Sequence, residues 1–259
     1  MKTEIIHKKF LNKKLLEKSL NHYKDFCNEK YVVSPSLPIL YFGDTRNYFK
    51  SSFKVITVGK NPSNVEFRLN SNQIYSYVRF PKYNNNIESL EGSLNNYFKV
   101  NPYKKWFNSF EPFLNGLECS YYDSSILNSA VHTDICSPLP TDPTWTKLPM
   151  KTRQNLFETG YKLWEDLIVN LKPDLVVISI AKKYLDYLNL RKICNVYSLT
   201  VTKDGILRKK PYELELYELE IQKFKTKLVY GNAANMPFGT VSNNEKLKMG
   251  GKVKNYLGF

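Results

Sequence analysis

Short runs of apolar, β-branched residues alternate along this chain with longer stretches of apolar residues at helical spacing. Four of the short runs are typical of buried strands: residues 53–59, 125–133, 174–180 and 228–230. Helical patterns occupy longer segments: residues 3–30, 88–99, 103–117, 150–171 and 181–189. Because strands separated by helices pair in parallel through right-handed crossovers, the order of elements predicts an α/β fold. We expect a three-layer domain with a central, mostly parallel sheet flanked by helices, plus an N-terminal helical extension.

This single domain is expected to cover the whole chain, residues 1–259, since no linker or internal repeat divides it. We assign residues 1–48 to the N-terminal helix and its connector. Residues 49–242 form the core, and residues 243–259 form a basic C-terminal helix.

The pattern between residues 196 and 221 differs from the rest. Val196–Lys203 and Tyr212–Ile221 are both strand-like, and the Asp204-Gly205 turn between them suits a hairpin. Glu and apolar residues alternate in the second of these strands, but the alternation shifts by one residue near Tyr217. We therefore expect a bulge or a break at that point.

Composition and charge narrow the choice of partner. No apolar run approaches the roughly 18 residues of a membrane span, and the first residues lack the apolar core of a signal peptide. We therefore expect a cytoplasmic protein that does not enter a membrane. The formal net charge is +14, which favours a polyanionic partner such as nucleic acid. A surface that is simply rich in lysine is the alternative.

The cysteines and histidines predict neither a metal site nor a cofactor. The four cysteines are widely spaced and include no C-x-x-C pair, and the three histidines have no ligand spacing. We expect no zinc, no iron–sulfur cluster and no bound cofactor. In a cytoplasmic protein the cysteines should be reduced and mostly buried.

Three loops follow predicted core strands: Gly59–Arg68, His132–Pro143 and Gly231–Ser242. The carboxyl ends of parallel strands share one edge of a sheet, where ligands bind, so these loops can converge. None of them is a Gly-rich dinucleotide turn or a phosphate-binding loop, and the chain has no G-x-S-x-G elbow.

The first two loops carry a family resemblance. Val-Gly-Lys-Asn-Pro-Ser at 58–63 resembles the first active-site motif of the uracil-DNA glycosylase superfamily. It is closest to the single-strand-selective and mismatch-specific branches, which have Gly-x-Asn-Pro-Gly; here Ser63 replaces the final Gly. Val-His-Thr-Asp-Ile-Cys-Ser-Pro-Leu at 131–139 resembles the second-strand segment. Asp134 stands where the single-strand-selective type has a base-reading Asn, with one extra residue before Pro138.

The third loop extends the resemblance. Asn-Met-Pro-Phe-Gly at 235–239 is similar to the family's late loop, which contacts phosphates and wedges into the gap left by a flipped-out base. Residues 171–179 resemble the third core strand and its lead-in. The similarity covers roughly residues 53–240, in order.

This resemblance implies a DNA glycosylase that extrudes a pyrimidine from DNA and hydrolyses its N-glycosidic bond, leaving an abasic site. A monofunctional enzyme is expected, because no lysine of the three loops except Lys60 stands near an evident nucleophile position. Such chemistry serves DNA repair or defence against modified phage DNA. Asn61 would hold the attacking water, and His132 would stabilise the departing base. Phe67 would stack on the base. The remaining candidates would contact the DNA backbone or wedge into the gap left by the base: Ser63, Asn235, Met236, Pro237 and Phe238.

Asp134 suggests which base is recognised. Cytosine presents an exocyclic amine, a donor that an acidic oxygen accepts, whereas uracil presents O4 and N3–H, which suit an amide. An acid at the reading position therefore favours a modified cytosine, as in hypermodified phage DNA, over uracil. Lys60 is the lysine that could challenge a monofunctional mechanism, by forming an imine.

Every candidate also has a purely structural interpretation. Asn61 could hold an Asx turn, Asp134 could cap a turn, and His132 could make an ordinary hydrogen bond within a strand. Phe67 and Phe238 could be core residues. Two further functions also fit: a non-catalytic DNA-binding module on the same scaffold, or a nucleotide-processing α/β enzyme. We expect a monomer in each case.

Overall fold

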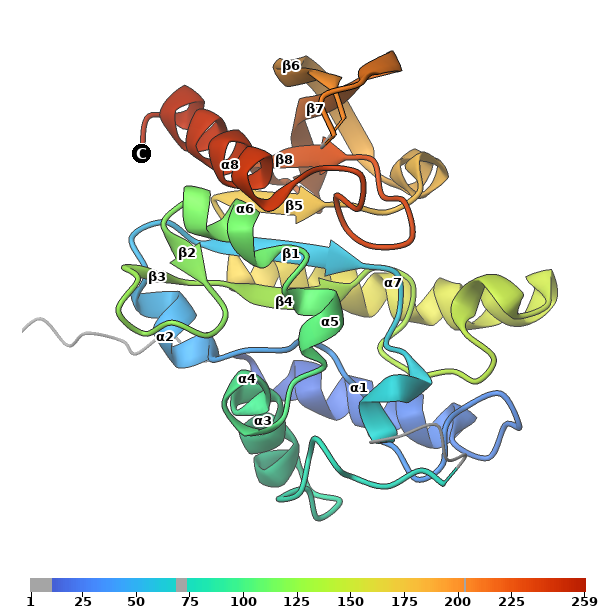
Figure 1. Cartoon of the computed structure of the whole chain (residues 1–259). Coiled ribbons are helices and arrows are strands. Elements are labelled where there is room, and N and C mark those ends of the chain that lie inside the picture. Colours follow the sequence, from blue (N-terminus) through green and yellow to red (C-terminus); the bar gives the residue numbers. More distant parts are fainter. Residues whose placement is uncertain (1–10, 69–73, 203) are drawn as a thin grey trace, which may run out of the picture.

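The computed structural model describes residues 11–68, 74–202 and 204–259. Its centre is a six-stranded sheet with the order β4-β1-β5-β8-β7-β6 (Figure 1). The strands, in that order, are Val131–Asp134, Val55–Gly59, Leu175–Ile178, Phe224–Gly231, Leu207–Ile221 and Asn189–Val201. The first four pair in parallel, and β7 and β6 are antiparallel to their neighbours. The predicted α/β fold with a mostly parallel sheet is confirmed.

The parallel strands are apolar because both of their faces are covered. Every residue of β1, β4 and β5 is buried. In Figure 1, α7 passes behind the sheet while α6 and α8 lie in front of it, which gives the three layers. The helices are α1 (Lys13–Phe26), α2 (Thr45–Lys50), α3 (Ile87–Asn95), α4 (Tyr97–Val100), α5 (Lys104–Phe107), α6 (Glu111–Gly116), α7 (Met150–Leu171) and α8 (Asn243–Leu257).

Several predicted elements differ in detail from the structure. The helices predicted at 88–99 and 103–117 are each split in two, into α3 and α4 and into α5 and α6. Pro112 explains the second break, because its ring has no N–H to continue a helix from α5. The helix predicted at 181–189 is the 3₁₀ helix η3 (Lys182–Tyr187).

Two more differences concern the predicted first helix and second strand. The strand predicted at 125–133 is divided into β3 (Asn128–Ser129) and β4, and β3 pairs with β2 (Cys119–Ser120) in a separate small sheet. The N-terminal helix begins at Lys13, where the Asn12 side chain accepts a hydrogen bond from the backbone of Lys14. The predicted part at 3–10 lies outside the described residues.

The predicted hairpin is formed by β6 and β7. Thr202 N donates to Ile206 O at 2.7 Å, and Gly205 has a φ of +77°, while Lys203 lies outside the described residues. The expected irregularity is found opposite Tyr217, in the partner strand. There the register shifts between Lys192 and Cys194, so the bulge belongs to β6.

Helices α6 and α8 approach closely enough for their backbones to touch. A Cβ atom on Gly116 would lie 2.1 Å from Leu247 O, and one on Gly250 would lie 2.1 Å from Phe113 O. Phe113 also stacks on Phe238, with ring centroids 5.0 Å apart. The helix crossing therefore anchors the loop that follows β8.

Among the residues that the structure describes, no helix combines the length and the apolar character that crossing a membrane requires.

Candidate functional site

A cavity of about 280 Å³ opens where the parallel strands end. This is near the lower end of the range of roughly 300–1,000 Å³ for small-molecule sites. The loops after β1, β4 and β8 all contribute to its lining. Six of the residues predicted from the sequence line this one cavity: Asn61, Ser63, His132, Asp134, Asn235 and Met236.

Strand pairing brings the first two loops together. Gly59, the last residue of β1, pairs with Asp134, the last residue of β4, and Cys136 N donates to Lys60 O at 2.8 Å just beyond. A Cβ atom on Gly59 would lie 2.3 Å from Asp134 Oδ1 and 3.0 Å from His132 Nε2. Glycine is needed here because both side chains lie over its Cα.

The side-chain amide of Asn61 has a fixed orientation. Nδ2 donates to Pro62 O at 3.0 Å, to Leu139 O at 3.3 Å and to Thr141 Oγ1 at 3.0 Å. Two of these partners are backbone carbonyls, which only accept, so the nitrogen must face them. Among the described residues no donor reaches Oδ1, which leaves that oxygen as the acceptor on a residue that lines the cavity.

His132 is buried and neutral. Burial lowers the pKa of its imidazole to about 3. Nδ1 lies 2.7 Å from Thr57 Oγ1, and the Thr57 hydroxyl in turn bonds the Tyr121 hydroxyl. Nε2 lies 3.9 Å from Asp134 Oδ1. Its ring packs among three aromatic rings, Phe42, Phe107 and Phe110.

Two buried carboxyl groups line the cavity. Asp134 is 7% exposed and Glu66, from the 3₁₀ helix η1 (Asn64–Phe67), is 4% exposed. Burial raises the pKa of Asp134 well above its usual range; the charge of Glu66 raises it further and that of Lys60 lowers it. Burial also raises the pKa of Glu66 to about 7, against the opposing effects of Tyr97 and Arg79.

Lys60 also lines the cavity, and burial lowers the pKa of its amine, while the nearby Cys136 and Asp134 raise it. Sequence reasoning singled out Lys60 but missed Glu66. The only signal for Glu66 was its place in the Gly59–Arg68 loop, since one acid among polar loop residues has no pattern of its own.

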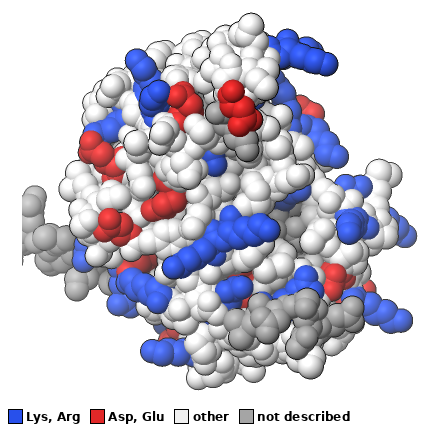
Figure 2. All heavy atoms as spheres, in the orientation of Figure 1, with Lys and Arg blue, Asp and Glu red and all other residues white. Residues whose placement is uncertain are grey.

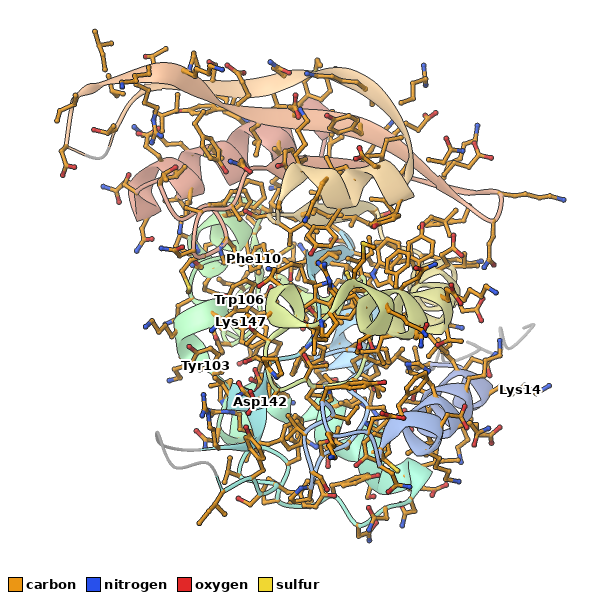
Figure 3. All side chains as sticks on the ribbon, turned by 90° about the vertical axis from the view of Figure 1, so that its right-hand side faces the viewer. Lys14, Tyr103, Trp106, Phe110, Asp142 and Lys147 are labelled. Carbon is orange, nitrogen blue, oxygen red and sulfur yellow. The ribbon has the colours of Figure 1, made fainter. Side chains whose placement is uncertain are left out.

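Aromatic side chains form much of the remaining wall. Tyr103 and Trp106 come from α5 and the residue before it, and Trp145 comes from the 3₁₀ helix η2 (Trp145–Lys147). Figure 3 looks onto the edge to which the β1 arrow points in Figure 1, and Tyr103, Trp106 and Lys147 lie along one line there. Tyr103 and Trp106 were not singled out, because helical spacing at 103–117 predicts core packing equally well.

Exposed lysines flank this aromatic wall. Lys104 and Lys105 lie beside Tyr103 and Trp106 in the chain, and Lys147 follows Thr146, which lines the cavity. Figure 2 shows Lys and Arg side chains in a band across the middle of the face that Figure 1 presents. The lysines that adjoin the cavity lining in the chain suit an anionic ligand.

Three predicted site residues do not reach the cavity. Phe67 is 0% exposed and its ring lies 5.4 Å from that of Phe80, so it cannot stack on a ligand in this cavity. Phe238 is also 0% exposed, and its backbone N–H donates to Ser179 Oγ at 2.8 Å. It is an anchor of its loop and cannot act as a wedge.

Pro237, the third of these residues, is buried, and its carbonyl accepts a hydrogen bond from Ser109 Oγ at 2.9 Å. All three corrections have the same cause: these three apolar side chains pack into the core. Their neighbours Glu66 and Met236 remain in the cavity lining.

No protein-family model matches the chain, and no curated protein matches it. Within the described ranges, no group of three or more His, Cys, Asp or Glu side chains is arranged to hold a metal ion.

Proposed function

We propose that this protein is a monofunctional DNA glycosylase that hydrolyses the N-glycosidic bond of a flipped-out pyrimidine and leaves an abasic site. A modified cytosine is favoured over uracil. The observation that carries the proposal is the convergence of Asn61, Asp134 and Met236, from the ends of three strands, on one cavity. The protein would act as a cytoplasmic monomer, in repair or in defence against modified DNA.

The orientation of Asn61 supports its role with water. An amide is too weak a base to remove a proton, but Oδ1 can accept a hydrogen bond from a water molecule and hold it near the sugar carbon. The three hydrogen bonds of Nδ2 fix that oxygen before any substrate arrives. The contribution is therefore geometric.

The network around His132 supports a role with the departing base. If Tyr121 donates to Thr57 and Thr57 donates to Nδ1, the ring proton is on Nε2, which is nearer to Asp134. A neutral N–H donor aimed at the developing negative charge stabilises the transition state most where water is excluded. The pKa of about 3 keeps this donor neutral over the whole physiological range.

The rim of the cavity supports DNA as the partner. Exposed Lys104, Lys105 and Lys147 would contact phosphates, with the salt dependence that such contacts bring. Half-buried Met236 lies at the cavity and would fill the space that the extruded base leaves in the stack.

Abasic-site formation tests the proposal. Wild type, Asn61→Ala and Asn84→Ala would be incubated with DNAs that contain uracil, cytosine or modified cytosines, and abasic sites would be counted after alkaline cleavage. Asn84 is an exposed loop residue away from the cavity, so its variant is a matched control. We expect wild type and Asn84→Ala to act equally on at least one DNA, with Asn61→Ala about 100-fold slower or worse.

Measurements of DNA binding, nucleotide turnover and covalent trapping, made beside this experiment, separate the competing functions. DNA binding without abasic sites on any substrate would favour a non-catalytic module, and turnover of free nucleotides without DNA binding would favour a nucleotide-processing enzyme. Borohydride trapping of a covalent complex through Lys60 would overturn the monofunctional mechanism.

A further inference from the structure

The two buried carboxyl groups of the cavity have oxygens without a protein partner. Among the described residues no donor lies within hydrogen-bond distance of the Asp134 carboxyl, since His132 Nε2 is 3.9 Å away. Glu66 accepts a hydrogen bond from Tyr97 through Oε2, at 2.5 Å, and its Oε1 accepts none within the same part of the chain. Both residues line the cavity.

Glu66 is held in place from behind. Arg79 Nε lies 3.6 Å from Oε2, on the same side as the Tyr97 hydroxyl. Arg79 is itself fixed by a 2.6 Å hydrogen bond from Nη1 to Asn101 O, and Tyr97 accepts one from Tyr103 N at 2.9 Å. With Oε2 occupied in this way, the carboxyl group presents Oε1 as its free oxygen.

Buried polar atoms are almost always hydrogen-bonded, because leaving one without a partner costs free energy. A ligand that fills this cavity and excludes water must therefore supply donors to both carboxyl groups. The Asp134 carboxyl group has no protein donor, so it keeps a free accepting oxygen in either protonation state, whereas Glu66 presents Oε1 as an acceptor when it is ionised. An acceptor such as O4 of uracil is satisfied only when the carboxyl group is protonated.

We propose that Glu66 is a second specificity-determining residue beside Asp134, and that the cavity selects a pyrimidine with two donor groups. One donor would be the exocyclic amine of a cytosine-type base. The other would be a hydroxyl or amino group on a substituent of the ring. This inference rests on the proposed function for its biological setting, but the preference itself is a property of the cavity.

Glu66→Gln gives the sharpest test because it changes the hydrogen-bonding character of the free atom. Tyr97 donates to Oε2 and the Arg79 cation lies on the same side, so both favour the amide oxygen there and turn the amide NH₂ towards the cavity. The variant thus replaces the free acceptor by a donor at nearly constant shape. Glu66→Asp, which retains the charge but withdraws it by one methylene, serves as a second variant should Glu66→Gln fail to fold.

Binding can be measured without catalysis. Trp106 and Trp145 line the cavity, so a bound nucleoside should quench their fluorescence. The probes are 5-hydroxymethyl-2′-deoxycytidine, 2′-deoxycytidine and 2′-deoxyuridine. We expect wild type to bind them in that order of decreasing affinity, and Glu66→Gln to bind the first about tenfold or more weakly. Glu17→Gln, which changes an exposed acid on α1, should bind as wild type does.

The outcomes separate this inference from the proposed function. Wild type that binds 2′-deoxyuridine as tightly as the hydroxymethylated nucleoside would overturn the inference, as would an unchanged order of preference in both Glu66 variants. Abasic sites formed equally well by wild type and Glu66→Gln would overturn it while leaving the glycosylase intact. If the nucleosides bind in the expected order but no DNA acquires abasic sites, the inference stands and the proposed glycosylase function is rejected.

Discussion

The two sides of the cavity are built in different ways. The polar wall consists of Asn61, Glu66, His132 and Asp134, and the rim consists of the aromatic Tyr103 and Trp106 together with Met236. Three of the four polar side chains are buried, whereas all three rim side chains are half-buried. The wall rests on paired strand ends and the 3₁₀ helix between them, and the rim on a short helix and a loop.

This difference matches the two tasks of the proposed DNA glycosylase. Reaction chemistry requires atoms held to within a fraction of an ångström, which paired strands and hydrogen-bonded side chains provide. Contact with a polymer requires accessible stacking surface and charge, which exposed helix ends provide. Substitutions in the wall should therefore change rate and specificity, and substitutions in the rim should change affinity.

Gly59→Ala should have the largest effect, because it disrupts the wall at its base. The new Cβ would lie 2.3 Å from Asp134 Oδ1, so the carboxyl group must move. We expect abasic-site formation to fall about 100-fold and the free energy of unfolding to fall by about 1–3 kcal/mol. Gly92→Ala is the control, because a Cβ on Gly92 has no neighbour within 4 Å and alanine favours the helix. Equal activity of the two variants would show that the wall tolerates displacement.

The pH dependence of stability should report the burial of Glu66. Its pKa is about 7 in the folded protein against 4.5 for the ordinary side chain, so the folded state binds the extra proton between these values. Wild type should therefore lose stability relative to Glu66→Gln as the pH rises from about 4.5 to 7, by at most about 3 kcal/mol.

Urea unfolding of both proteins at several pH values measures this difference. His132 and His22, whose lowered pKa values give stability that grows as the pH rises, are present in both proteins and cancel. Parallel stability curves would contradict a raised pKa for Glu66.

Trp106→Ala tests the rim. Loss of one stacking side chain typically costs about 1–3 kcal/mol, so the dissociation constant for a single-stranded oligonucleotide should rise about 10–100-fold. The rate of excision at saturating DNA should change much less. Fluorescence anisotropy measures the affinity, with Tyr256→Ala as the control, since Tyr256 is 54% exposed on α8. A large fall in the saturated rate with unchanged affinity would reverse the roles of wall and rim.

Lys147→Gln should give the smallest effect. Removal of one phosphate contact should reduce the slope of log affinity against log salt by about 1 and weaken binding equally for all sequences. Lys14→Gln is the matched control, because Lys14 is exposed on α1 and lies far from Tyr103 and Trp106 in Figure 3. Equal salt slopes for the two variants would exclude Lys147 from the contact.

The regular parts of the fold were predictable because their apolar patterns are clear. β5 is an uninterrupted apolar run and the 22-residue helix α7 has helical spacing, and the loops after the strands follow from parallel pairing. The break between α5 and α6 was not predicted, since a proline near a helix start and a proline inside a helix look alike in one sequence.

For the site, polar residues could be predicted and aromatic ones could not. Asn61 and Asp134 have no place in a core, so a loop position was informative for them. Phe67 and Phe238 fit both a binding surface and a core, and only tertiary packing decides between these. Glu66 depends on Tyr97 and Arg79, which are distant in the sequence, so no local pattern marks it.

The crossing of α6 and α8 has a consequence for laboratory evolution of the protein. Gly116 and Gly250 determine how closely α6 approaches α8. Phe113 on α6 stacks on Phe238, which lies two residues after Met236, and so positions that loop. A larger residue at either glycine would move the wedge candidate without touching the cavity. A mutant library that aims at new base preference should leave these glycines unchanged and vary residues 232–236, most of which are exposed.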